Sequence, residues 1–242
     1  LTLRKYFVAD VALLSIASVT GGKVVVVVAG ASVGVVSGAA VVEGTGRGVV
    51  SPAGRGTVVV GAAAGGVGAV EITLTTPGAL AAIADLASDS PKDWVVGAGT
   101  VLDEKAAREV IARGARFVVS PTLDRGVVRY CRDKNVPCLP GALTPTELLE
   151  AWRAGATVVK LFPAGTVGPR YLREVLAPLP FLRIVPSGGV AHENAADWIR
   201  AGAAAVSVGG GLVSSGVVRD ESWAELTANA RALVQAVAEA RA

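Results

Sequence analysis

Apolar and polar positions alternate in a regular way along most of this chain. Short apolar runs rich in β-branched residues predict buried strands at 67–73, 94–99, 116–120, 136–140, 157–162, 183–186 and 204–208. The amphipathic segments between these runs predict helices at 77–86, 104–113, 124–134, 145–154, 169–176 and 194–201. Strands that alternate with helices predict a parallel sheet and therefore an α/β fold.

Several of the predicted helices carry terminal signals in the sequence. Pro77 lies in the first turn of one helix, and Asp103 stands at the N-cap position of another. Thr144-Pro145 followed by Glu147 has the pattern of a capping box. Glycine follows the helix ends at Gly114, Gly155 and Gly202.

The first quarter of the chain does not share this pattern. Residues 1–60 are rich in Val, Gly and Ala, and we expect them to supply an N-terminal helix at 1–20 and one strand, at Val24–Val28 or at 57–60. With that strand, residues 61–242 would close a single-domain (β/α)8 TIM barrel, whose chemistry lies at the C-terminal ends of its strands. The alternative is an open doubly wound sheet, which the lack of a G-x-G-x-x-G motif after an early strand disfavours.

The composition excludes several classes of protein. The 242 residues are 52% hydrophobic, and their net charge of +3 comes without a basic block that contains aromatics, which argues against a nucleic-acid partner. No apolar span of about 20 residues predicts a membrane helix. The single histidine, His192, excludes a site with several histidine ligands to a metal. Cys131 and Cys138 lack CxxC spacing, and we interpret them as buried thiols of a reducing, cytoplasmic compartment.

One lysine lies inside a predicted buried strand. Lys160 interrupts the β-branched run 157–162, where a charged amine is costly unless it is paired or its pKa is shifted. One hypothesis is a lysine that reaches the strand end and pairs with a carboxylate. The other is a desolvated, partly neutral amine that attacks a carbonyl to form a Schiff base.

One acid lies inside another predicted strand. Glu71 is the only acidic residue within these apolar runs, and it precedes Thr73 and Thr75. It would serve either as a structural ion-pair partner of Lys160 or as a general acid/base beside the amine. Proximity alone cannot decide between the two, because both require the same geometry.

Glycine-rich turns follow the last two predicted strands. Ser187-Gly188-Gly189 and Gly209-Gly210-Gly211 stand where barrels of this kind commonly bind phosphate through backbone N–H groups. Tight strand-to-helix turns would also account for these glycines.

With these residues in place, the chain resembles the bacterial 2-keto-3-deoxy-6-phosphogluconate (KDPG) / 4-hydroxy-2-oxoglutarate (KHG) aldolases from about Ala62 to the C-terminus. The resemblance rests on six blocks in family order: Val70–Leu74, Val96–Leu102, Val119–Pro121, Pro140-Gly141, Val159–Ala164 and Pro186–Val190. It implies a class I aldolase, a homotrimer, and no metal or organic cofactor.

The resemblance also implies roles for individual residues. Lys160 is similar to the family's Schiff-base lysine, and Glu71 to its proton-transferring acid/base. Substrate contacts are implied for Thr73, Thr75, Thr100, Pro121, Phe162, Ser187, Gly188, Gly189, Gly209 and Gly210. The family often has arginine at the position of Thr75, so in this chain the substrate carboxylate would rest on hydroxyls and backbone donors.

The predicted reaction is retro-aldol cleavage of a small 2-keto-4-hydroxy acid. It would convert KDPG to pyruvate and glyceraldehyde 3-phosphate, or KHG to pyruvate and glyoxylate. A phosphate-binding barrel epimerase or isomerase, with Glu71 as the base, is the rival enzyme. A catalytically disabled barrel is the rival that is not an enzyme.

Overall fold

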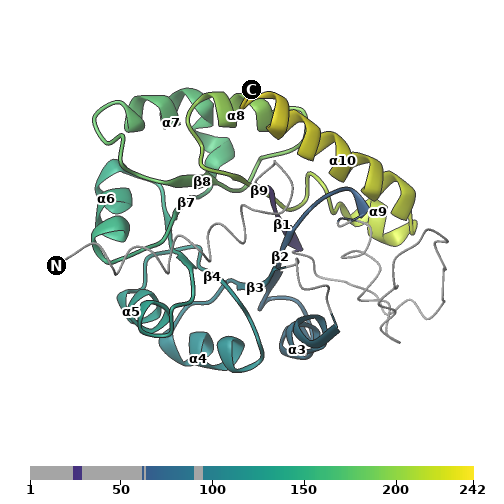
Figure 1. Cartoon of the computed structure of the whole chain (residues 1–242), viewed down its shortest axis with the longest axis horizontal. Coiled ribbons are helices and arrows are strands. Elements are labelled where there is room, and N and C mark those ends of the chain that lie inside the picture. The colour runs from purple at the N-terminus through teal and green to yellow at the C-terminus, as the bar shows by residue number, and fades with distance from the viewer. Residues whose placement is uncertain (1–23, 29–61, 63, 90–94) are drawn as a thin grey trace.

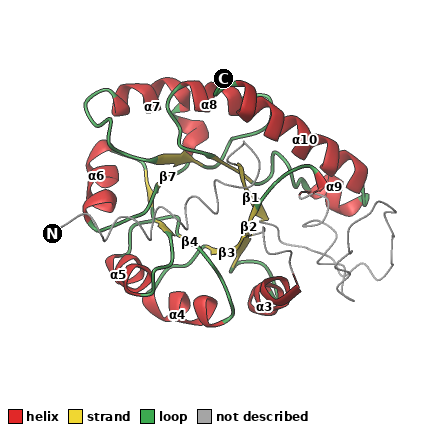
Figure 2. Cartoon of the chain, in the orientation of Figure 1, coloured by secondary structure: helices red, strands yellow, loops and turns green. Residues whose placement is uncertain are grey.

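The computed structural model describes residues 24–28, 62, 64–89 and 95–242, and these form a ring of strands surrounded by helices (Figures 1 and 2). The strand predicted at Val24–Val28 is present as β1. The predicted helix at 1–20 and the alternative strand at 57–60 lie outside the described residues. The division into a segment 1–60 and a barrel 61–242 therefore stays a prediction.

The strands are short and parallel. Their bounds are β1 Val24–Val28, β2 Ala69–Thr73, β3 Val95–Gly99, β4 Val118–Val119, β5 Cys138–Leu139, β6 Gly141–Ala142, β7 Val159–Leu161, β8 Ile184–Pro186 and β9 Val206–Val208. Hydrogen bonding orders them β5-β4-β3-β2-β1-β9 and β6-β7-β8. Each predicted strand is thus present, and most are shorter at the ends than the apolar run that predicted them.

Two links join these two groups of strands into one ring. β5 and β6 flank Pro140 in a single stretch of chain, and the Pro140 carbonyl itself accepts from the Lys160 N–H at 2.9 Å. At the other junction, Ser187 and Ser207 form a bridge, and the Ala204 N–H donates to the Ile184 carbonyl at 2.8 Å. Because β5 and β6 share one position, the described strands occupy the eight positions of a (β/α)8 barrel. The predicted fold class is confirmed.

Helices cover the outside of the ring (Figure 2). Their bounds are α3 Ala79–Asp89, α4 Glu104–Ala112, α5 Arg125–Asp133, α6 Pro145–Arg153, α7 Gly168–Leu176, α8 Ala195–Arg200, α9 Ser215–Arg219 and α10 Trp223–Glu239, with a 3-10 turn η1 at Ala164–Thr166. The six helices predicted between residues 77 and 201 are all present, although α3 begins at Ala79 and leaves Pro77 outside it. The helices α9 and α10 were not predicted.

The predicted caps explain where two of the helices begin. The Asp103 carboxylate accepts from the Ala106 N–H at 2.7 Å. At α6, Thr144 and Glu147 form the reciprocal pair of a capping box. Side chains that satisfy free N–H groups in this way commonly stabilise a helix by about 1 kcal/mol.

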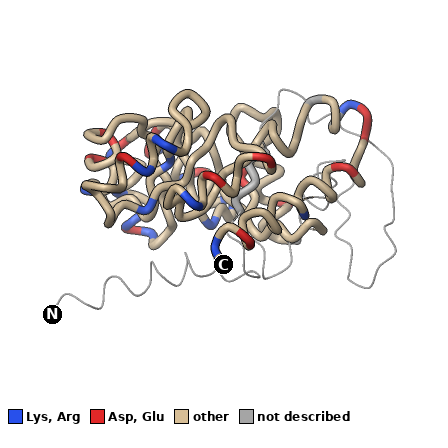
Figure 3. The backbone as a smooth tube through the Cα atoms, turned by 90° about the horizontal axis from the view of Figure 1, so that it is seen from above, with Lys and Arg blue, Asp and Glu red and all other residues tan. Residues whose placement is uncertain are grey.

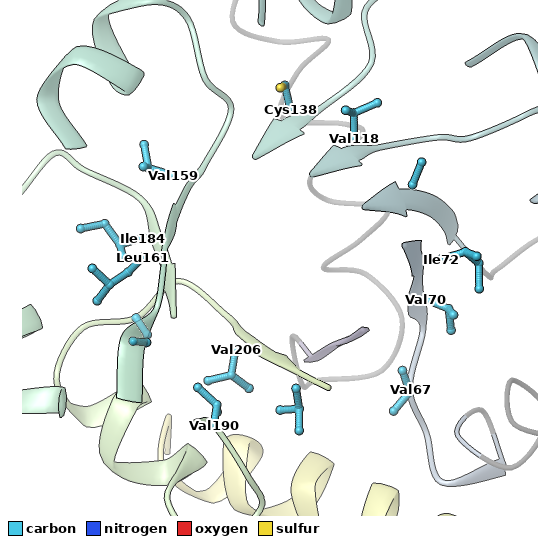
Figure 4. Close-up of a cluster of buried hydrophobic side chains, with 14 of the residues drawn as sticks. Val67, Val70, Ile72, Val118, Cys138, Val159, Leu161, Ile184, Val190 and Val206 are labelled. Atoms are coloured by element: carbon cyan, nitrogen blue, oxygen red, sulfur yellow. The ribbon is translucent and has the colours of Figure 1, made fainter. Parts of the chain in front are cut away.

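The alternation of side chains along each strand separates two apolar cores. Outward-facing residues such as Val70, Ile72 and Val206 pack under the helices in the larger core (Figure 4). Cys131 and Cys138 belong to this core and are free thiols, as predicted. The smaller core fills the inside of the ring and consists of Ala69, Val95, Phe117, Val119, Leu139, Val158, Val185 and Ala205.

The outer surface carries charges of both signs. Figure 3 shows Lys and Arg positions interspersed with Asp and Glu. Glu104 on α4, for example, pairs with Arg108 on the same helix and with Arg129 on α5. In the part of the chain that the structure describes, no helix has the length and apolarity needed to cross a bilayer.

Candidate active site

Glu71 and Lys160 both point into the ring, just beyond its inner apolar core. On β2, Ala69 belongs to that core, so Glu71, two residues later, faces the same side. On β7, Val158 belongs to the core, and Lys160 follows at the same spacing. Each residue therefore lies one inward-facing position nearer than the inner core to the C-terminal end of the barrel, where (β/α)8 barrels hold their chemistry.

Two glycines on the neighbouring strand make room for large side chains, Gly97 for the Phe117 ring and Gly99 for the Glu71 carboxylate. The register pairs Glu71 with Gly97 and Thr73 with Gly99. A Cβ on Gly97 would collide with the Phe117 ring, and a Cβ on Gly99 would collide with Glu71 Oε1. The carboxylate thus occupies the space of an absent side chain on β3.

The Glu71 carboxyl group is sealed from solvent. Its residue is 1% exposed, and Oε2 has no hydrogen-bond partner. Burial raises the pKa of Glu71 above its ordinary value, and the nearby positive charge of Lys160 offsets only part of that rise. An unpartnered buried oxygen is costly, so this atom is available for a proton or for a bound molecule.

The pKa of the Lys160 amine is shifted downward, opposite to that of Glu71. The residue is 8% exposed, and burial lowers its pKa, with the charge of Glu71 as the smaller opposing effect. No N–O distance between the two side chains falls within the 4.0 Å of an ion pair. The hypothesis of a structural ion pair therefore fails: each group responds to the charge of the other without direct contact, and burial favours the neutral form of both.

Phe162 connects the lysine to the glycine turn after β8. It faces the same side of the chain as Lys160, and its ring centroid lies 4.9 Å from Lys160 Nζ. On another side, a Cβ at Gly188 would lie 3.3 Å from Phe162 Cε2. The ring is thus close to both the amine and the turn.

Two backbone turns approach each other beside this ring. Gly188 and Gly189 have φ values of 81° and 75°, which favour glycine. The Gly165 N–H donates to the Gly188 carbonyl at 2.8 Å, and a Cβ on Gly189 would lie 2.8 Å from Gly165 Cα. The turns after β7 and β8 can come this close only because both lack side chains.

A group of threonine hydroxyls follows β2. Thr73 Oγ1 lies 3.0 Å from Thr75 Oγ1 and 3.1 Å from Thr76 Oγ1. Thr73 and Thr76 are buried, whereas Thr75 is exposed. Thr100, at the end of the adjacent strand β3, has a φ of 57°, a strained conformation for a β-branched residue. Strain of about 1–3 kcal/mol of this kind is common at functional sites.

The other predicted contacts, Pro121, Gly209 and Gly210, follow the C-terminal ends of their strands. Pro121 follows β4, and its carbonyl lies against Gly141. Gly209 and Gly210 follow β9; the Gly209 carbonyl accepts from Leu212 and Val213, and the Cβ position of Gly210 is open.

Ser207 is a site residue that the sequence analysis missed. Its Oγ lies 3.3 Å from the Ser187 Oγ, and both serines are buried. Ser207 faces the inside of the ring because it follows Ala205 of the inner core by two positions. This alternation of inward- and outward-facing residues along the strand is the sequence signal that could have identified Ser207. Among the described residues, no group of three or more His, Cys, Asp or Glu is placed to hold a metal ion.

Comparison with known proteins decides the family. A family model described as "KDPG and KHG aldolase" matches residues 57–229. The chain belongs to the KDPG and KHG aldolase family. It is 37% identical over 180 residues to a 2-dehydro-3-deoxy-phosphogluconate aldolase of Pseudomonas aeruginosa, an alignment that covers 74% of this chain and 81% of the relative. A probable 2-dehydro-3-deoxy-6-phosphogalactonate aldolase of Rhizobium meliloti is 36% identical over 165 residues, covering 66% and 78%.

Solved structures of the family share the fold of this aldolase. A structure described as native KDPGal has a TM-score of 0.77 at 28% identity and covers 92% of this chain and 97% of its own. A Legionella pneumophila KDPG aldolase, with pyruvate captured as a covalent carbinolamine, has a TM-score of 0.69 at 28% identity, covering 74% and 87%. A protein cage designed by fusing symmetric oligomeric domains also matches, with a TM-score of 0.77 at 28% identity, covering 92% and 74%.

Proposed function

We propose that this aldolase cleaves a phosphorylated 2-keto-3-deoxy sugar acid through a Schiff base on Lys160, with KDPG as the substrate and pyruvate and glyceraldehyde 3-phosphate as the products. The observation that carries the proposal is a buried amine, its pKa lowered by burial, that faces a buried carboxyl group without forming an ion pair with it. A neutral amine is the nucleophile that imine formation requires.

The first half of the reaction builds the imine. Neutral Lys160 Nζ adds to the C2 ketone of the substrate, and loss of water gives a protonated imine. Glu71 gives and takes the protons of this dehydration, which its unpartnered Oε2 leaves it free to do. Burial raises the pKa of the Glu71 carboxyl group, which brings its protonated form closer to neutral pH and so favours its use both as an acid and as a base.

The second half breaks the carbon–carbon bond. The electrons of the C3–C4 bond flow into the protonated imine, and Glu71 accepts the proton of the C4 hydroxyl as the aldehyde forms. Glu71 then returns a proton to C3 of the enamine, and water releases pyruvate from Lys160. One well-placed acid/base contributes roughly 10²–10⁴ to the rate of such transfers.

The ends of the substrate match two regions at the mouth of the barrel. The close turns at Gly165, Gly188 and Gly189 can bring backbone groups to a phosphate, as glycine turns after the late strands of such barrels commonly do. The hydroxyls of Thr73 and Thr75, with Thr100, would receive the carboxylate. Pro121, Gly209 and Gly210 would complete the two ends of the binding site.

Two other substrates, the galactonate compound and KHG, are also supported by the comparisons with known proteins. The relative from Rhizobium meliloti and the native KDPGal structure point to the galactonate compound, which differs from KDPG in configuration at C4. The family description names KHG as well, whose cleavage would give pyruvate and glyoxylate. The same lysine and glutamate would act on all of these compounds, since the bond that breaks is the same.

We also propose that the protein assembles as a homotrimer. The oligomeric domains of the designed cage that this chain matches support an assembly of this kind. Size-exclusion chromatography with light scattering measures it directly, and a mass of one or two chains would contradict the trimer.

One experiment tests the reaction, and a second tests the substrate. Sodium borohydride with pyruvate should reduce the imine and leave a permanent pyruvyl adduct on Lys160, identified by peptide mass spectrometry. An epimerase or isomerase, or a disabled barrel, would gain no adduct. Coupled assays of pyruvate release should then show the highest kcat/KM for KDPG. Preference for the galactonate compound or for KHG would overturn the substrate and leave the Schiff base intact.

A further inference from the structure

The Lys160 nitrogen becomes positively charged in a place that disfavours positive charge. A neutral amine adds to the ketone, but the imine that breaks the C3–C4 bond is protonated. Lys160 is 8% exposed, and burial makes any cation there costly. Something close to the nitrogen must offset that cost while the bond breaks.

The neighbouring strands offer no full negative charge in direct contact with this nitrogen. β6 and β8, which flank β7, carry no titratable side chain in Gly141–Ala142 or Ile184–Pro186. Glu71, across the ring, is the one charged group among the described residues that affects Lys160, and when it is ionised to accept the C4 hydroxyl proton its charge acts on the nitrogen without direct contact. Glu71 is also outside ion-pair distance.

The face of the Phe162 ring offers a negative partial charge close to the nitrogen. Lys160 Nζ lies 4.9 Å from the ring centroid, within the range of a cation–π interaction. The π-electrons give each ring face a negative partial charge that attracts a cation. Such an interaction is strongest where water is excluded, as it is at this buried amine.

The ring is also held in place for this task. Phe162 follows Lys160 by two residues, in the turn directly after β7, so the backbone sets the relative position of the two side chains. On its other side the ring lies against Gly188, where a Cβ would stand only 3.3 Å from Cε2. Gly188 leaves the space that the ring occupies.

We propose that Phe162 is a catalytic residue, whose ring face stabilises the positive charge on the Lys160 nitrogen from imine formation to carbon–carbon cleavage. This inference rests on the proposed Schiff-base function and adds an electrostatic role to the apolar wall that Phe162 would otherwise provide. An apolar wall and a cation–π partner differ in one measurable respect, because only the second depends on the electron density of the ring.

A fluorination series isolates that electron density. Site-specific incorporation replaces Phe162 with 4-fluoro-, 3,5-difluoro- and 3,4,5-trifluorophenylalanine, which keep the shape of the ring and progressively remove its negative face. The pyruvate concentration needed for half-maximal borohydride trapping should rise with each fluorine, by about ten- to thirtyfold over the series. The pH midpoint of trapping should move downward, since the free ammonium form loses the same stabilisation, and kcat should fall in step.

Control variants separate the cation–π role of Phe162 from the Schiff base on Lys160. The same trifluoro side chain at Phe181, which is 51% exposed and packs beside Trp152, should change neither trapping nor kcat. Phe162→Leu, an apolar wall without π-electrons, should behave like the trifluoro variant. If wild type traps pyruvate and the fluorinated series does not differ from it, the cation–π role is wrong and the Schiff base stands. If wild type itself gains no adduct, the proposed function fails.

Discussion

The carboxylate of Glu71 occupies the space that a side chain on Gly99 would fill. Glu71 lies on β2 and Gly99 on β3, and the register places Gly99 beside Thr73, two residues beyond the glutamate. A Cβ on Gly99 would collide with Glu71 Oε1. The position of the proposed acid/base therefore depends on a residue that has no functional group.

Gly99→Ala should displace the carboxylate and lower kcat by about a hundredfold or more, because general acid/base transfer depends on position. The extra methyl group should also destabilise the fold by about 1–3 kcal/mol. Steady-state kinetics and urea unfolding measure the two effects. Gly216→Ala is the matched control, because a Cβ at that position in α9 would make only ordinary contacts, the nearest at 3.7 Å. Equal activity of both variants would show that the Gly99 space does not position Glu71.

Lys160→Arg should abolish cleavage. Arginine keeps the positive charge, but its guanidinium group stays protonated and forms no imine with a ketone. Pyruvate release measured over long incubations would detect residual turnover. Retention of more than a few per cent of wild-type activity would rule out the proposed nucleophile. Circular dichroism should show an intact barrel, so that the loss is one of chemistry.

Glu71→Gln should make the protein more stable at alkaline pH than wild type. The raised pKa means that folded Glu71 keeps its proton above the pH at which the unfolded carboxyl group loses it, about 4.3. Above that pH, wild-type stability should fall by about 1.4 kcal/mol per unit until the folded group ionises, because the unfolded state then binds fewer protons. The Glu71→Gln variant has no carboxyl group at this position, so its stability should not fall with pH in this way.

Urea unfolding of both proteins at several pH values between 4 and 9 measures that difference. The variant and wild type should be nearly equal in stability at the acidic end and should diverge as the pH rises. A stability difference that stays constant with pH, or one that favours wild type at alkaline pH, would contradict the raised pKa. The variant should also lose cleavage activity at every pH.

Thr73→Val should weaken substrate binding more than it slows chemistry. Valine keeps the shape of threonine but removes the hydroxyl that lies within 3.1 Å of both Thr75 and Thr76. Loss of one hydrogen bond costs about 1 kcal/mol, so KM should rise roughly fivefold while kcat changes less. Steady-state kinetics with KDPG separates the two constants. An unchanged KM would remove Thr73 from the binding of the carboxylate.

Helix caps and strand positions in the described part of the chain could be predicted from the sequence, because they depend on residues close together along it. Asp103 and Thr144 cap the helices that the sequence placed after them, and the apolar, β-branched runs placed most strands within a residue or two of their bounds. The helix α10 was missed because many of its positions are alanine, which packs without a sharp apolar stripe. Ser207 was missed because a serine inside a short strand reveals its direction only once the neighbouring positions are known to face inward.

The sequence alone determined the alternation of strands and helices, the lone lysine and lone acid within apolar strands, and the family resemblance, because each of these depends on residues near one another in the chain. Only the tertiary structure decided that Lys160 and Glu71 share one buried interior without an ion pair. It also decided that Gly99 on β3 makes room for the carboxylate and that the Phe162 ring lies close to both the amine and the Gly188 turn. The physical reason is that burial and register arise from the closure of the ring, which brings together strands far apart in the sequence.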